Sequence, residues 1–314
     1  MSRVALAGVL PVVKPPGMTS HDVVDHCRRA FGLRRVGHAG TLDPAAAGVL
    51  VICLGVATRI AGYLSESDKR YRAEIWFGIT TDTHDAEGEV TACRPAEGLS
   101  LERVREVLAA FVGAQQQVPP RVSAVRQGGR RAYERHRRGE DVELAPRPVT
   151  IHALDVVDWH PGPWPRLLLD VRCSKGTYIR ALARDLGEAL GCGAVLGALV
   201  RTAAGPFALE GARTLEEVDR AARSGRGGEL LIDPAEALSF LPAWRLSPDD
   251  ARRVRNGAPP APRFGGTNRP GVTGGGDDGR VRLLDPEGRL LAVARLERRG
   301  EQLVARPETV MVSS

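Results

Sequence analysis

The chain has 314 residues, of which 44 are basic and 38 acidic, so its formal net charge at pH 7 is +6. This length exceeds the usual size of one domain, and we expect a large domain followed by a smaller one. The five cysteines are scattered and form no C-x-x-C pair, which argues against a disulfide scaffold and against a zinc ribbon.

The first predicted elements are a strand and a helix. The apolar run VALAGVLPVV is interrupted by Pro11 and is followed by no small-residue cleavage site, so a strand is favoured over a signal peptide. No later apolar run has the length of a membrane span, and we expect a cytoplasmic protein that makes no membrane contact. The stretch TSHDVVDHCRRAFG predicts a helix that Thr19 or Ser20 caps and Gly32 ends.

A lone carboxylate, Asp43, stands in the next segment, GHAGTLDPAAAGVLVI, with no second acid and no cysteine nearby in the sequence. Gly37 and Gly40 permit unusual backbone angles, and Pro44 favours an extended conformation at Asp43. The apolar run VLVICLG predicts a strand that is buried on both faces. Asp43 is therefore expected on a rigid loop beside the core.

Alternation in KRYRAEIWFGI predicts a half-buried strand with Tyr71 facing inward. After an amphipathic helix in SLERVREVLAAFVG, the segment RLLLDVRCSKGTYIRALARDLGEALG predicts a strand, a turn at Lys175 and Gly176, and a second helix. Tyr178 and Arg180 are expected in the first turn of that helix. An arginine there opposes the helix dipole, so we expect an anion nearby.

The character of the sequence changes near residue 242. RLSPDDARRVRNG predicts a short helix, FGGTNRPGVTGGGDDGR a flexible loop, and the remaining residues short strands separated by turns. We therefore predict a large domain over residues 1–240 and a small β-rich domain over residues 241–314.

Basic composition is weak support for a nucleic-acid partner, because only three of the 44 basic residues are lysines, as a GC-rich coding sequence would also give. Residues 121–138 hold seven arginines and one glutamate. A solvated helix face and a phosphate-binding surface both remain open for them, and the interleaved Tyr133 and His136 favour the second. The lysines at positions 14, 69 and 175 indicate sites that prefer an ammonium to a planar guanidinium.

Other chemistries have less support. The doublets His21-Asp22 and His84-Asp85 suggest an HD-type metal-dependent phosphohydrolase, but chance and helix capping explain them better, and we expect no metal site. A paired-carboxylate hydrolase stays open, because folding can bring in a distant acid. The sequence has neither a P-loop nor a G-x-S-x-G elbow.

Several segments carry a family resemblance in one order along the chain: KPPGMTSHDVV, GHAGTLDPAAAGVLVICLGVATR, SDKRYRA, TTDTHDAEG, an SA…G…AYE segment and CSKGTYIRALARDLGEALGCGA. Over roughly residues 9–205 they resemble the TruB family, the bacterial tRNA pseudouridine(55) synthases. The last domain resembles a PUA-type RNA-binding domain. The resemblance implies an α+β pseudouridine-synthase fold, with a mixed, largely antiparallel sheet flanked by helices and a small β-rich PUA-like domain.

The resemblance also implies a reaction. Such an enzyme flips a T-loop uridine of tRNA (position 55) out of its stack, breaks the N-glycosidic bond and rejoins the base through C5. This isomerisation requires no cofactor, and the expected partner is the T-arm stem-loop of tRNA, with no obligate protein partner. By resemblance, Asp43 is the nucleophile, Arg180 pairs with it and keeps it ionised, and Tyr71 stacks on the base and helps to move a proton.

The same resemblance assigns further roles. His38 would fill the space that the flipped base vacates, and Tyr178 and Leu199 would line the pocket. A basic segment near residues 115–145 is expected to bind RNA. The individual residues expected to contact RNA are Lys14, Arg59, Lys69, Lys175, Arg130 and Arg131. The chain departs from the family at Leu199-Val200-Arg201, where L-R-R is frequent. A non-catalytic RNA-binding or tRNA-chaperone protein on this fold is the alternative.

Overall fold

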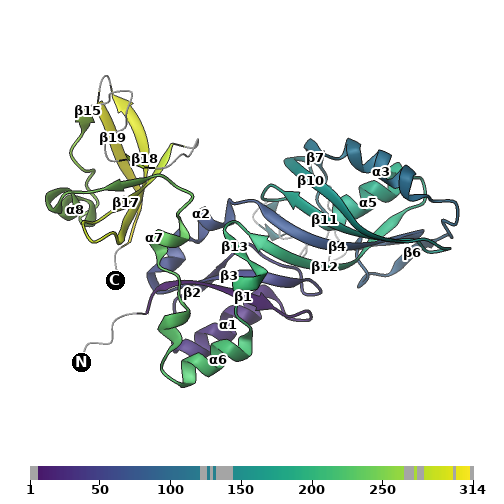
Figure 1. Cartoon of the computed structure of the whole chain (residues 1–314), viewed down its shortest axis with the longest axis horizontal. Helices are drawn as coiled ribbons and strands as arrows, with labels where there is room; N and C mark the ends of the chain where they lie inside the picture. Colours follow the sequence, from purple (N-terminus) through teal and green to yellow (C-terminus); the bar gives the residue numbers. More distant parts are fainter. Residues whose placement is uncertain are drawn as a thin grey trace.

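The computed structural model describes residues 6–120, 126–127, 130–131, 144–264, 272–273, 279–299 and 302–311. Two β-sheets organise this part of the chain, one built from the first two thirds and one from the C-terminal residues (Figure 1). Among the helices in these ranges, none is both long and apolar enough to cross a bilayer.

The larger sheet has nine strands in the order β1-β3-β12-β4-β11-β10-β7, with β2 paired to β3 and β13 paired to β12. Its pairs are antiparallel except β3 with β12, so the predicted mixed, largely antiparallel sheet is confirmed. Its strands are β1 (Gly8–Lys14), β2 (Val36–Ala39), β3 (Ala47–Leu54), β4 (Lys69–Phe77), β7 (Gly113–Gln117), β10 (Arg147–His160), β11 (Arg166–Cys173), β12 (Ala194–Ala204) and β13 (Phe207–Ala208).

Helices pack against different parts of this sheet (Figure 1). The helices α1 (Ser20–Phe31) and α6 (Leu215–Arg223) lie at the β1 end, α3 (Leu101–Ala110) lies beside β10, and α5 (Ile179–Ala189) packs against β12 and β4. Thr19 caps α1, and Gly32 ends it in a left-handed conformation, as the sequence predicts. Three short helical segments complete this part: η1 (Gly55–Ile60), α2 (Ala61–Ser65) and η2 (Leu209–Gly211).

Two small hairpins form two-stranded sheets of their own: β5 (Ile79–Thr81) with β6 (Val90–Cys93), and β8 (Arg126–Gln127) with β9 (Arg130–Arg131). The second hairpin is all that the structure describes of the basic segment 121–138, so Tyr133 and His136 lie outside the described residues. The interpretation of that segment as an RNA-binding surface stays a prediction.

The C-terminal sheet has six strands in the order β15-β19-β18-β17-β14-β16. They are β14 (Ala243–Arg245), β15 (Arg263–Phe264), β16 (Val272–Thr273), β17 (Arg280–Leu284), β18 (Leu290–Arg299) and β19 (Gln302–Val310). The predicted short helix is present as α8 (Pro248–Arg255), and Trp244 is fully buried in the core beneath it. The β-rich character of this region is confirmed, while the PUA-like label and the boundary at residue 240 stay predictions.

The two sheets share a hydrophobic cluster that joins Val9, Val51 and Ile60 to Leu284 and Val293. The connection between them runs through η3 (Gly227–Leu230) and α7 (Pro234–Ala237). Polar contacts add to this cluster. Arg280 of β17 pairs with Glu66 at 2.6 Å and lies over the Tyr63 ring, 5.2 Å from its centre.

Candidate active site

Asp43 lies on the loop between β2 and β3, and Arg180 is the second residue of α5. Arg180 Nε lies 3.0 Å from Asp43 Oδ2, although the two residues are far apart in the sequence. The Asp43 side chain is 44% exposed and the Arg180 side chain only 6%. A buried guanidinium therefore holds a carboxylate that remains accessible from solvent.

A second acid, Asp85, shares the same arginine. Arg180 Nη1 lies 3.5 Å from Asp85 Oδ2, and it also donates to the Thr83 carbonyl at 3.2 Å. The Asp85 side chain is 16% exposed and accepts hydrogen bonds at Oδ1 from the Thr83 hydroxyl and from the Glu87 N–H. The sequence did not indicate this contact, because His84-Asp85 was considered only as a possible metal-binding doublet, whereas Asp85 pairs with the Arg180 guanidinium.

The start of α5 is fixed by a buried glutamine of β7. Tyr178, the N-cap residue of α5, donates from its N–H to Gln117 Oε1 at 2.8 Å, and Gln117 Nε2 donates to the Tyr178 carbonyl at 3.1 Å. Arg180 is in the first turn as predicted, whereas Tyr178 is one position before it. Gln117 thus orients the turn that carries Arg180, a role that the sequence did not indicate.

Tyr71 and Leu199 lie on neighbouring strands of the larger sheet. Leu199 of β12 is opposite Ala73 of β4, and Tyr71 of β4 is opposite Arg201 of β12. Burial raises the pKa of the Tyr71 hydroxyl, and the Arg201 guanidinium opposes this shift. The phenol is therefore protonated at neutral pH and able to donate a proton.

Lys14 ends β1 and is fully buried. Its ammonium donates to the carbonyls of Pro15, Met18 and Pro44 at 3.0, 2.6 and 2.9 Å. These three hydrogen bonds use all three of its N–H groups, which contradicts the expected RNA contact. Lys14 instead anchors the backbone directly after Asp43.

Lys69 is likewise buried at the start of β4, where its ammonium donates to the carbonyls of Ser65 and Ser67 at the end of α2. Burial and the nearby Arg201 guanidinium lower its pKa from 10.5 to about 8. The expected RNA contact from this position is therefore not supported either.

The other expected RNA contacts lie at the surface or outside the description. Arg59 donates to the Val310 carbonyl of β19 at 2.8 Å, and Lys175 lies 3.5 Å from Glu66. Arg130 and Arg131 form β9, and their side chains are outside the described residues.

His38 is half-buried in β2, opposite Ile52 of β3. Gly37 also lies in β2, so only Gly40 has the unusual backbone angle expected of both glycines, with φ of 98°.

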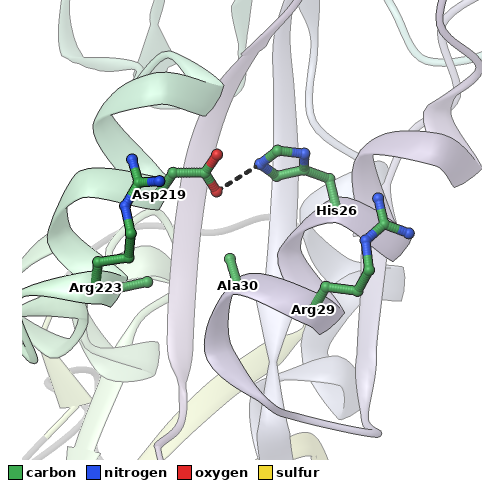
Figure 2. A pocket seen from close by; sticks show the side chains of 6 residues that line it. His26, Arg29, Ala30, Asp219 and Arg223 are labelled. Carbon is green, nitrogen blue, oxygen red and sulfur yellow. Dashed lines mark hydrogen bonds and ion pairs between the residues drawn. The ribbon is translucent and has the colours of Figure 1, made fainter.

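His26, near the middle of α1, contacts a neighbouring helix. His26 Nε2 lies 2.8 Å from Asp219 Oδ1 of α6. Both residues line a hollow of about 420 Å³ between the two helices, with Arg29 on the α1 side and Arg223 on the α6 side (Figure 2). No residue of the Asp43 loop or of α5 lines this hollow. In the described ranges, no three His, Cys, Asp or Glu side chains gather as metal ligands would.

The buried ammonium of Lys14 makes stability depend on pH. Burial lowers its pKa from 10.5 to about 8, although the Asp43 carboxylate opposes the shift. Between about pH 8 and 10.5 the unfolded chain holds a proton here that the folded chain has released, so this lysine makes the free energy of unfolding rise with pH.

We therefore expect the free energy of unfolding of the wild type, relative to that of Lys14→Met, to increase from pH 7.5 to pH 9.5. Urea denaturation of both proteins at the two pH values measures this, and the variant corrects for thiols and tyrosines that titrate in the same range. A constant or falling difference would contradict the assigned burial of the charge.

Comparison with known proteins places this arrangement in a family. A family described as "TruB family pseudouridylate synthase (N terminal domain)" matches residues 28–179, and "tRNA pseudouridylate synthase B C-terminal domain" matches residues 180–238. The chain belongs to the TruB family of pseudouridylate synthases. It is therefore an isomerase by class, and the non-catalytic and phosphohydrolase alternatives are not favoured.

Individual relatives cover most of the chain. It is 52% identical over 256 residues to tRNA pseudouridine synthase B of Symbiobacterium thermophilum, which spans 82% of this chain and 84% of that protein. It is 47% identical over 294 residues to tRNA pseudouridine synthase B of Thermobifida fusca, with 91% and 94% covered. The predicted TruB resemblance is confirmed.

A solved structure confirms the fold as well. The archaeal box H/ACA sRNP Nop10-Cbf5 complex contains a chain of 23% identity that superposes with a TM-score of 0.73, covering 98% of this chain and 87% of that one. At this level of identity the match concerns architecture alone. It agrees with the pseudouridine-synthase fold, including a C-terminal β-rich region.

Proposed function

We propose that this TruB-family enzyme converts a uridine in the T-loop of tRNA, at position 55, to pseudouridine, with Asp43 as the nucleophile. The observation that carries the proposal is the contact of 3.0 Å between Asp43 and Arg180. Curated relatives that cover most of the chain are named tRNA pseudouridine synthase B, which supports tRNA as the substrate.

The reaction requires an ionised carboxylate as the nucleophile and no cofactor. The C1′–N1 bond breaks, a C1′–C5 bond forms, C5 releases its hydrogen as a proton and N1 takes one up, so no electron or group leaves the nucleoside. A carboxylate can add to the reacting nucleoside and be released again. The Arg180 guanidinium stabilises the anion by direct Coulomb attraction, which is strengthened because the arginine is buried.

The remaining residues take supporting roles in this proposal. The target uridine must leave its stack before Asp43 can reach it, at a cost of a few kcal/mol. Tyr71 and Leu199 lie on adjacent strands and are positioned to hold the extruded base, with the protonated Tyr71 hydroxyl available for a proton transfer. His38 on β2 would occupy the space that the base leaves in the RNA.

The test uses a T-arm stem-loop RNA, purified enzyme and a chelator, with no other additive. After digestion to nucleosides, chromatography should show one uridine lost and one pseudouridine gained per RNA, and sequencing after carbodiimide treatment should place it at the T-loop position that corresponds to uridine 55. Pseudouridine at another nucleotide would contradict the proposed target position. Tight RNA binding without any product would instead favour a non-catalytic RNA-binding protein.

A further inference from the structure

Arg201 of β12 is a buried arginine that contacts the loop of Asp43. The residue is only 1% exposed, yet its guanidinium makes hydrogen bonds to three backbone carbonyls. Nε donates to Val49 at 2.7 Å, Nη1 to Thr41 at 3.1 Å and Nη2 to Gly40 at 3.0 Å. One planar group therefore binds β3 and the loop that precedes it.

The carbonyls of the next three residues of this loop accept hydrogen bonds from different groups. The Ser20 hydroxyl donates to the Leu42 carbonyl at 3.0 Å, and the Ala46 N–H donates to the Asp43 carbonyl at 3.1 Å. Lys14 and the Gly17 N–H both donate to the Pro44 carbonyl. The carbonyls of Gly40 and Thr41 are the pair that Arg201 satisfies, and they come directly before Leu42 and Asp43 in the chain.

The backbone of Arg201 also lies close to the start of β3. Arg201 is the register partner of Gly48 in the one parallel pair of the larger sheet. A Cβ on Gly48, whose φ is 107°, would lie 2.3 Å from the Arg201 carbonyl oxygen, so no larger residue fits there. Backbone and side chain of Arg201 therefore fix both the strand that follows Asp43 and the turn that precedes it.

We propose that Arg201 is a positioning residue for the isomerisation: its guanidinium holds the Gly40–Thr41 turn so that the Asp43 carboxylate stays opposite Arg180. This inference rests on the proposed role of Asp43. A lysine cannot replace the arginine, because a single ammonium cannot donate in one plane to three carbonyls that surround a fork of five N–H groups. Arg201 is also the register partner of Tyr71 on β4, so it lies beside a second residue of the site.

A purely structural role would predict a different set of effects, and a matched control separates the two. Arg282 of β17 also donates from its guanidinium to two backbone carbonyls, those of Leu241 and Ala235, in the connection to the C-terminal sheet. Its loss should lower stability without touching the Asp43 loop. Arg282→Met is therefore the control for loss of a carbonyl-binding arginine.

The experiment compares Arg201→Met, Arg201→Lys and Arg282→Met in the full chain with a T-arm stem-loop. Thermal unfolding, the Kd for the RNA and the single-turnover rate constant at 20 °C are measured for each. A displacement of the order of 1 Å in a reacting group can cost about 100-fold in rate. We expect both Arg201 variants to lose about that factor, with a Kd within threefold of wild type, and Arg282→Met to keep its rate within threefold.

The inference is overturned if an Arg201 variant that is folded at 20 °C keeps its single-turnover rate, or if its loss of activity lies entirely in Kd. If Arg201→Met does not fold, Arg201→Lys decides by the same two criteria. A wild type that makes no pseudouridine would instead defeat the proposed function, so the two failures are distinguishable.

Discussion

Replacement of Asp43 by asparagine should abolish pseudouridine formation, with a loss of at least about 10⁴-fold in the single-turnover rate, while the Kd for a T-arm stem-loop stays within a few-fold of wild type. The amide is nearly isosteric with the carboxylate but cannot act as a nucleophile. The side chain is 44% exposed, so the change should cost the fold little.

A matched control is available for this result. Asp170 is also a half-exposed aspartate, 40% accessible, that pairs with an arginine, Arg72, at 2.8 Å on the neighbouring strands β11 and β4. Asp170→Asn should keep its rate. Residual activity of Asp43→Asn above a few per cent, in protein shown by mass spectrometry to be free of deamidation at residue 43, would remove Asp43 from the chemistry.

The second large effect is expected for Arg180→Met. Removal of the guanidinium leaves two carboxylates, Asp43 and Asp85, without the cation that both contact. Loss of one partner of a buried ion pair costs about 3–5 kcal/mol, and the exposure of Asp43 should keep the loss of stability near the lower end. We expect the single-turnover rate to fall about 10²- to 10³-fold or more, since a preorganised charge at the reacting centre is lost.

Arg184 provides the control for this variant. It lies one turn further along α5 and pairs with its neighbour Asp185 at 2.6 Å, away from the Asp43 loop. Arg184→Met should retain the wild-type rate. Compared with Arg180→Met, the variant Arg180→Lys should regain more of the wild-type stability than of the wild-type rate, because a lysine keeps the charge but lacks the planar guanidinium that contacts both acids. Equal rates for Arg180→Met and Arg184→Met would show that the ion pair is only structural.

The sequence predicted the local settings of the site better than its contacts. The sequence around each residue predicted its local structure: Asp43 on a rigid loop before a buried strand, Tyr71 on a strand of alternating polarity and Arg180 in the first turn of a helix. The expectation of an anion near Arg180 followed from the helix dipole alone. That this anion is Asp43 came from the family resemblance, because no periodicity relates a loop to a helix so far along the chain.

The misses share a physical cause. Asp85, Gln117 and Arg201 act through contacts between segments distant in sequence, and those contacts depend on the strand order and register of the larger sheet. The opposition of Arg201 and Tyr71, for example, exists only because β12 pairs with β4. Asp85 had a signal, since it lies in one of the ordered family segments, but its hydrophilic surroundings favoured a simple turn.

The lysines show a partial success. Their scarcity marked Lys14 and Lys69 as special, and both are buried and bonded to carbonyls beside the site. The expected RNA contact was wrong for Lys14 because this lysine ends a strand that is buried along nearly its whole length. A cation in such a strand serves backbone carbonyls, since solvent and phosphate do not reach it.

The central claim concerns one carboxylate, and a crystal structure of the Asp43→Asn variant bound to a T-arm stem-loop tests it most directly. Our account predicts that one T-loop uridine is out of its stack, with its C1′ or its base within contact distance of the side chain at position 43 and with Arg180 still beside that side chain. A uridine that remains stacked in the loop, or an RNA bound with residue 43 facing away from it, would contradict the account.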